Sequence, residues 1–470
     1  AGVYARATSA KPVAAPGGTI EVSVEIVPRA LPVTVQRIEL PGAAPLAKAT
    51  PIAIGKKEKL ALSVSVPAQA PPSAPYWLAL PPTPGHYMVG DARQIGTPRQ
   101  PAALEATVEL LIAGRAVRIT LPVVHAWTDP VRGERTRPFV IVPPATVTPV
   151  RDAVMAVGGK SGAVVLRVRA GHDALAAKVE LALPAGWTAK PAVQDVALAK
   201  TGDETTVRFE VTPGASAAAG EARPVVHADN ASWSLREDTI DYAHLPLQVV
   251  LRPAAVQLVP LQIKLPAGRV AYVRGSGDSI AGDLTHVGFT VDDLDDEALR
   301  TGDLSRYATI ILGIRAYNTR DAVRAAHARL LAYVERGGTL IVQYNTLALD
   351  GPVGPYGLEL GRDRITDETA APTFIDPKDP LLNTPNKITP ADFDGWVQER
   401  GIYFASKWDA HYHPVLRFSD PHEGPLDGAL VVARHGKGRY IYTGLVLFRE
   451  LPAGVPGAYR LFANLIGAGR

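Results

Sequence analysis

The chain has 470 residues and a net charge of +3, so it is long enough for about three domains of roughly 150 residues each. Hydrophobic residues make up 47% of the sequence and charged residues 20%, which is typical of a globular protein with buried cores. Basic residues are dispersed among acidic ones, so no nucleic-acid partner is expected. The absence of cysteine excludes disulfides, thiolate nucleophiles and cysteine metal sites.

The first region, residues 1–140, is predicted to form a β-sandwich. Apolar and polar residues alternate over Ile20–Ile26 and again over Leu60–Val66, as in strands with one buried face. A short Ala-Gly-Arg turn separates Thr107–Ile112 from Ala116–Leu121, which predicts a hairpin.

Residues 141–253 are predicted to form a second, Ig-like β-sandwich. Apolar residues alternate over Val164–Val168, Val179–Leu183 and Val207–Val211, and the last two strands end at proline- and glycine-containing turns. Turn signals spaced at about ten residues favour a sandwich.

The pattern changes in residues 254–470. Short apolar strands at Val270–Val273, Thr309–Leu312 and Thr339–Val342 alternate with helical segments, such as 319–336. This order predicts a parallel sheet with right-handed crossovers, in a three-layer α/β domain of the flavodoxin or class I glutamine-amidotransferase type.

Polar residues follow the predicted parallel strands, where open α/β sheets bind their ligands. These candidate ligand-binding residues are Asp278, Arg315, Tyr317, Asn318, Tyr344 and Asn345. Arg315 would hold a carboxylate or phosphate, and Asp278 would accept hydrogen bonds from hydroxyl groups. The alternative is that these groups cap helices and satisfy loop backbone. Gly275 and Gly277 make a weak dinucleotide signal, because Ile280 stands where a third glycine is needed.

A second candidate cluster contains Trp408, Asp409, His411 and His413. A His-x-His pair on a strand would place both imidazoles on one face, and Asp409 would add an oxygen ligand for a metal ion. The aromatic residues could equally stack on a sugar or pack structurally. Arg449, next to Glu450, is a further ligand-binding candidate or a member of a buried ion pair.

Several longer motifs resemble the C-terminal region of large bacterial PIG-L (LmbE-like) deacetylases. They are GIRAYNT at 313–319, GGTLIVQYNT at 337–346, DFDGWVQERG at 392–401, RELPAG at 449–454 and WTDPVRGE at 127–134. Region 141–253 resembles the small sandwich domain attached to some α-galactosidases. Region 266–470 resembles a class I glutamine-amidotransferase domain.

The resemblance implies a secreted or periplasmic, cell-envelope protein whose parent hydrolyses N-acetyl groups on amino sugars. Its Ala-His-Pro-Asp-Asp-Glu zinc motif does not occur in this sequence, so any zinc would belong to a PIG-L catalytic domain upstream of Ala1 or on a separate polypeptide. The chain begins without methionine, and we expect a removed leader or a longer parent polypeptide. The sequence contains no run of about 20 apolar residues, so no transmembrane segment is predicted.

The amidotransferase nucleophile is also missing, because the strand at Thr339–Val342 leads into Gln343, Tyr344 and Asn345. We therefore expect no catalytic residue and no cofactor in this chain. Three functions stay open: a glycan- or partner-binding accessory region, an interaction module of an envelope assembly, and a hydrolase. The hydrolase would use Asp278, Arg315, His411 and His413, with a carboxylate or histidine as general base.

Overall fold

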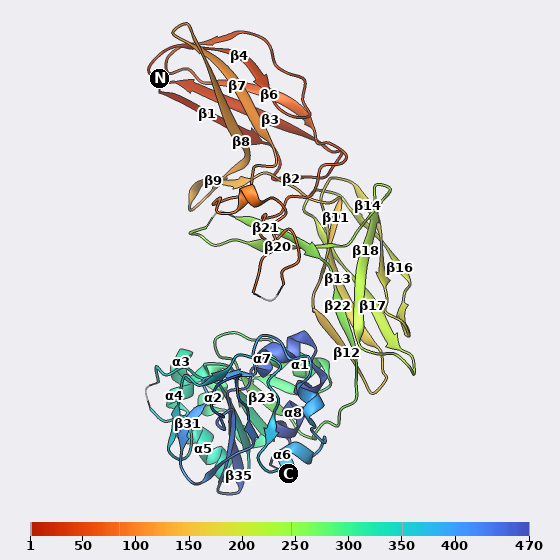
Figure 1. Ribbon diagram of the computed structural model, residues 1–470, viewed down its shortest axis with the longest axis vertical. Helices are drawn as coiled ribbons and strands as arrows, with labels where there is room; N and C mark the ends of the chain where they lie inside the picture. The colour runs from red at the N-terminus through yellow and green to blue at the C-terminus, as the bar shows by residue number, and fades with distance from the viewer. Residues whose placement is uncertain (1, 84, 246, 350, 470) are drawn as a thin grey trace.

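The computed structural model describes residues 2–83, 85–245, 247–349 and 351–469. The chain forms three regions that follow one another along the long axis of the molecule (Figure 1). A strand-rich region lies at the N-terminal end, a second lies beside it, and the region that contains the α-helices lies at the far end.

The first region is a β-sandwich built on one apolar core. Its elements are β1 (Val3–Ser9), β2 (Val13–Ala14), β3 (Thr19–Pro28), β4 (Val33–Glu39), β5 (Thr50–Ile52), β6 (Glu58–Ser65), η1 (Ala92–Gln94), β7 (Glu105–Ile112), β8 (Arg115–Asp129), β9 (Gly133–Pro138) and β10 (Val140–Ile141). The strands pair in the order β5-β4-β7-β8-β1-β3-β6, with β9 against β8. The predicted alternation in β3 is present, because Ile20, Val22, Val24 and Ile26 are all buried in this core.

The second region is also a sandwich, with sheet orders β11-β13-β17-β15 and β12-β22-β18-β14-β16. Its strands are β11 (Ala145–Pro149), β12 (Ala153–Val157), β13 (Gly162–Ala170), β14 (Leu175–Ala182), β15 (Trp187–Lys190), β16 (Val193–Leu198), β17 (Glu204–Pro213), β18 (Gly220–Ala228), β19 (Ala231–Trp233), β20 (Leu235–Ile240), β21 (Gln248–Pro253) and β22 (Val256–Leu261). Strands β20 and β21 pair with each other and form an arm toward the first sandwich (Figure 1).

The predicted boundary between residues 253 and 254 is wrong. β22 pairs with β12 in parallel and with β18 in antiparallel fashion, so the second sandwich continues to Leu261. The proline at position 253 ends β21, but the next strand returns to the same sandwich and does not start a new domain.

The C-terminal region contains a mixed sheet with the order β24-β23-β25-β26-β35-β34-β32. The strands from β24 to β35 in this order are parallel, β34 pairs antiparallel with β35, and β32 pairs antiparallel with β34. Their bounds are β23 (Val270–Val273), β24 (Val291–Asp293), β25 (Thr309–Leu312), β26 (Thr339–Gln343), β32 (Tyr412–Pro414), β34 (Leu430–His435) and β35 (Gly438–Thr443). Shorter strands are β27 (Leu358–Leu360), β28 (Arg364–Ile365), β29 (Thr373–Phe374), β30 (Gly401–Ile402), β31 (Ala405–Trp408) and β33 (Leu416–Arg417).

Helices cover both faces of this sheet. They are α1 (Ile280–His286), α2 (Asp296–Thr301), α3 (Ala316–Thr319), α4 (Asp321–Ala325), α5 (His327–Glu335), α6 (Pro380–Asn383), α7 (Leu447–Ala453) and α8 (Pro456–Ile466), with 3-10 turns η2 (Leu304–Arg306) and η3 (Pro390–Phe393). Ile311 and Ile341 belong to the core with α1, α7 and α8, whereas Ile310 and Leu340 belong to the core with α2, α4 and α5. The strands are apolar on both sides because both sides are covered. The single helix predicted over 319–336 is interrupted at Arg320, whose backbone is extended.

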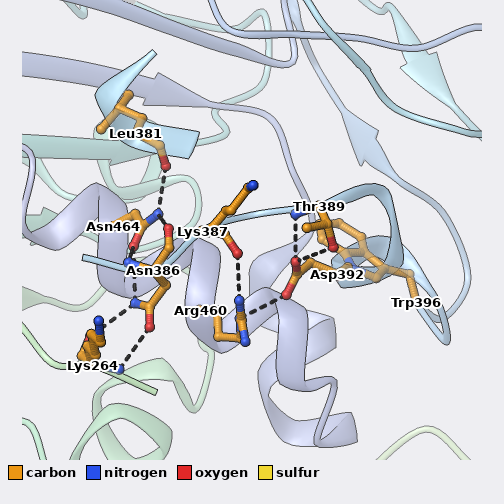
Figure 2. Close-up of polar contacts among 9 residues, drawn as sticks. All are labelled: Lys264, Leu381, Asn386, Lys387, Thr389, Asp392, Trp396, Arg460 and Asn464. Atoms are coloured by element: carbon orange, nitrogen blue, oxygen red, sulfur yellow. Dashed lines mark hydrogen bonds and ion pairs between the residues drawn. The ribbon is translucent and has the colours of Figure 1, made fainter. Parts of the chain in front are cut away.

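A buried polar network fixes the segment around η3 against α8 (Figure 2). Asn464 on α8 is fully buried and donates to the carbonyls of Leu381 and Asn386 at 2.8 and 2.7 Å. Its side-chain oxygen accepts from the backbone and side-chain nitrogens of Asn386 at 2.9 and 3.1 Å. Arg460, one turn earlier, forms an ion pair with Asp392 at 2.9 Å. These contacts tie distant parts of the chain into one fold.

The second sandwich packs directly on the C-terminal region. Met155, Val259 and Leu261 lie in the same apolar core as helices α1 and α7. The partly exposed Arg151 forms an ion pair with Asp283 at 2.6 Å. In the part of the chain that the structure describes, no helix is long and apolar enough to span a bilayer.

Candidate functional site

The candidate site lies where the parallel strands β23, β25, β26 and β35 end. Because carboxyl ends of parallel strands meet at one edge of a sheet, the loops after these strands come together. They carry Asp278, Arg315 and Tyr344, and α7 after β35 carries Arg449.

A cluster of three hydrogen-bonded side chains lies at the base of this edge. The Tyr272 hydroxyl on β23 donates to Asp278 Oδ1 at 2.6 Å, and Gln343 Nε2 on β26 donates to Tyr272 Oη at 3.2 Å. Burial, and then the Asp278 charge, raise the pKa of Tyr272 well above its ordinary value, so the hydroxyl keeps its proton. Asp278 Oδ2 and Gln343 Oε1 are buried and have no hydrogen-bond partner among the described residues. Two acceptors are therefore left for a donor that the described residues do not supply.

Two glycines allow these groups to approach. A Cβ on Gly313 would lie 2.9 Å from Tyr272 Oη and 3.1 Å from Asp278 Oδ2. A Cβ on Gly275 would lie 2.0 Å from the Ile314 carbonyl oxygen, which leaves no space for a side chain. The loops after β23 and β25 can therefore pack backbone to backbone.

Arg315 is held in a strained conformation at the centre of the edge. Its backbone has φ 57° and ψ 24°, a left-handed region that non-glycine residues seldom adopt. The Arg315 N–H donates to the Tyr344 carbonyl at 2.8 Å, which fixes this backbone against the neighbouring strand end. Its Nε is buried without a hydrogen-bond partner among the described residues. Such strain clusters at functional sites, where the surrounding structure maintains it.

Aromatic rings line the same edge beside a second arginine. The Tyr344 ring stacks on Tyr403, with centroids 5.9 Å apart and an interplanar angle of 10°, and it contacts Phe448 at 5.5 Å. Burial raises the pKa of Tyr344, while the charges of Arg315 and Arg449 act in the opposite direction. Arg449 lies 4.9 Å over the Phe448 ring and 3.6 Å from the Glu399 carboxylate.

Glu450 is a buried carboxyl group next to this site. Its Oε2 accepts from the Val397 N–H at 3.0 Å, whereas Oε1 is buried without a partner among the described residues. Burial raises the pKa of Glu450 to about 8, so the carboxyl group is largely protonated at neutral pH. Arg400 is also buried, donates to the Ala370 carbonyl at 2.9 Å and lies 5.5 Å over the Trp396 ring.

Three predicted site residues instead hold the loops together. The Tyr317 hydroxyl contacts His327 Nδ1 at 2.9 Å, and the Asn318 side chain bonds the backbone of Thr346. The buried Asn345 side chain accepts from the Tyr317 N–H at 3.1 Å and donates to the Gln343 carbonyl at 2.9 Å. This is the loop-satisfying alternative raised for the strand-end residues.

The predicted donors Asp409, His411 and His413 are not brought together. His411 bonds Asp409 at 2.5 Å and stacks on Tyr356 at 4.1 Å, whereas His413 lies 3.2 Å from Asp379. His411 stands in a turn before β32, so the two imidazoles do not share one strand face. Over the described ranges, no three His, Asp or Glu side chains form a metal-binding group. Trp408 packs against the apolar core and is partly exposed.

The sequence pointed to Gln343 and Glu450 only as neighbours of candidate residues, and it did not point to Tyr272 or Tyr403. The signal for Tyr272 was a tyrosine inside an otherwise aliphatic strand, since such a buried hydroxyl needs a partner. Tyr403 lies in a left-handed conformation, with φ 53°, that the sequence does not announce. The contact between the 392–401 and 449–454 motifs, a hydrogen bond from the Val397 N–H to Glu450, is seen only in the structure.

The arrangement favours binding over bond-breaking chemistry. β26 ends at Gln343 and continues into Tyr344, and the described residues of the loop 344–357 form no helix. The sharp strand-to-helix turn that exposes a nucleophile is therefore missing from this part of the chain. Unpartnered acceptors, an arginine and stacked aromatic rings can together hold a hydroxylated ring that carries an acidic group.

Residues 159–228 match the protein family described as NPCBM-associated, NEW3 domain of alpha-galactosidase. The match lies within the second sandwich and confirms its predicted likeness to the α-galactosidase-associated domain. No match supports the PIG-L or amidotransferase resemblances, which stay predictions. No curated protein matches the chain.

Similar solved structures are distant. A protein of unknown function from Porphyromonas gingivalis W83 has 12% identity and a TM-score of 0.17, covering 55% of this chain and 100% of that one. Red sea bream transglutaminase has 10% identity and a TM-score of 0.25, covering 53% and 31%. The D0-D1 domain of intimin has 11% identity and a TM-score of 0.17, covering 54% and 97%. Likenesses at this level carry no argument about function.

Proposed function

We propose that this chain is the non-catalytic, glycan-binding accessory region of a secreted PIG-L-type deacetylase that acts on N-acetyl sugars. The family match of the second sandwich, to a domain named for α-galactosidase, supports a carbohydrate-related role. The motif resemblances at 313–319, 337–346 and 392–401 support the PIG-L context. Zinc does not fit the described residues, because three suitable donors do not converge. The deacetylation step therefore belongs to another domain or another polypeptide.

The strand-end edge is the observation that carries this proposal. Among the described residues, Asp278 Oδ2 and Gln343 Oε1 are buried acceptors without a donor, and Arg315 Nε is buried without a partner. Sugar hydroxyl groups supply such donors, and an acidic or acetylated substituent would accept from Arg315. The partly exposed Tyr344 ring, stacked on Tyr403, would contact a pyranose. Each of these groups lies at the end of a strand that the sheet holds rigidly.

A glycan array probed with the full chain tests the proposal. We expect Arg315→Ala to weaken binding by roughly tenfold or more, because it removes hydrogen bonds from a charged donor. Arg336→Ala is the matched control, since Arg336 is an exposed arginine just after α5 and precedes β26 at the opposite end of that strand. Equal binding by the unmodified chain and both variants would contradict the proposed site. No binding by the unmodified chain would favour the envelope interaction module instead.

A further inference from the structure

A separate cavity of about 490 Å³ lies between the first sandwich and the β20–β21 arm. Its volume is in the range of small-molecule sites. Most of its wall is apolar and includes Pro101, Pro122, Pro138, Phe139, Leu247 and Val249. Segments from both strand-rich regions therefore enclose one space that is large enough for a small organic molecule.

Arg137 on β9 lines this cavity and is the charged group that distinguishes it. Its Nε is buried, and within the described ranges the guanidinium forms no hydrogen bond or ion pair. Glu237 and Asp241 act on it electrostatically from a distance, and burial lowers its pKa. The Arg137 side chain is partly exposed, so its guanidinium is open to an anionic ligand that enters the cavity.

A second unpartnered group lines the same space. Gln100 Oε1 is buried and accepts no hydrogen bond from the described residues. Arg99 and Glu105 also line the cavity, but both are exposed and their charges are opposite. Inside the cavity, one cation and one neutral acceptor are thus set in an apolar wall.

We propose that this cavity binds a small organic carboxylate. The carboxylate pairs with the planar fork of Arg137, which matches its geometry. A hydroxyl or N–H group of the ligand donates to Gln100 Oε1, and the ligand's carbon skeleton packs on the proline and aliphatic walls. A doubly charged phosphate fits less well, because the Gln100 side-chain oxygen and the Glu105 carboxylate also line the cavity. The inference is independent of the strand-end site.

Calorimetric titration of the full chain with benzoate and with glucuronate tests this proposal. Benzamide and glucose are the uncharged counterparts of the two acids. We expect one acid to bind and its uncharged counterpart to show no saturable heat; which acid binds distinguishes an aromatic ligand from a sugar acid. Arg137→Met should weaken binding by roughly tenfold or more. Arg135→Met, two residues earlier on β9 and outside the cavity lining, should bind as the unmodified chain does.

Thermal unfolding without ligand separates this role from a structural one. Arg137→Met keeps the length of the side chain and removes a partly exposed guanidinium that has no hydrogen-bond or ion-pair partner among the described residues, so we expect an unchanged or higher melting temperature. A clear fall in the melting temperature would assign Arg137 to the fold and overturn the proposal. Failure of both acids to bind the unmodified chain, or equal binding by Arg137→Met, would overturn it as well.

Discussion

Replacing Glu450 with glutamine should change how the stability of the C-terminal region depends on pH. Glu450 is fully buried and burial raises its pKa from the ordinary 4.5 to about 8. Between these values the folded state keeps a proton that the unfolded state has lost. The free energy of unfolding therefore falls as pH rises, by about 1.4 kcal/mol for each pH unit. Over the whole window this amounts to at most about 5 kcal/mol, and the dependence ends above pH 8.

Glutamine keeps the shape of the side chain and an oxygen that can accept from the Val397 N–H. It has no proton to lose, so Glu450→Gln should be about as stable as the unmodified chain near pH 5. At pH 8.5 to 9 the variant should be more stable by up to about 5 kcal/mol. Urea unfolding followed by tryptophan fluorescence at several pH values measures this difference. Glu335→Gln, at an exposed helical position, is the control. Parallel pH profiles for Glu450→Gln and the unmodified chain would refute the reasoning.

Two further substitutions test the packing of the same region. Asn464→Leu should lower the free energy of unfolding by about 4 kcal/mol, because it removes four buried hydrogen bonds at about 1 kcal/mol each; a loss below about 1 kcal/mol in urea titrations would contradict the network's role. Gly275→Ala should destabilise by about 1–3 kcal/mol and weaken glycan binding, because its Cβ would overlap the Ile314 carbonyl beside Arg315. Unchanged thermal stability and array binding would show that the loop has space that the structure does not provide.

Local sequence pattern was enough to place many strands. Ile20–Ile26 alternates because one face of β3 is buried, and Thr309–Leu312 is apolar throughout because helices cover both faces. The predicted domain boundary near residue 254 was wrong because β22 joins its sheet by pairing with β12, which lies about a hundred positions earlier in the chain. The break at Arg320 was also missed, because the helical spacing over 319–336 rests on apolar residues from Ala322 onward and carries no information about position 320.

The rule that ligands bind at strand ends selected this edge of the sheet as the candidate site. Sequence could not tell which polar side chains the fold itself would satisfy. In the sequence, Asn345 and Asn318 are as good candidates for ligand contact as Asp278, yet in the structure their side chains bond the loop backbone. Tyr272 and the Ile280 N–H both bond Asp278 Oδ1, whereas Asp278 Oδ2 has no partner among the described residues. That distinction depends on contacts between strands, which a single sequence does not display.

The packing of the second sandwich on the C-terminal region has a consequence for how such proteins can be cut and recombined. β22 ends at Leu261, β23 begins at Val270, and Met155 and Val259 lie in the core that also holds Leu451. Division of the gene within 262–269 would leave each product with an apolar face that water cannot solvate. Residues 145–469 therefore form one cassette, and any exchange of ligand preference between proteins of this design must transfer both parts together.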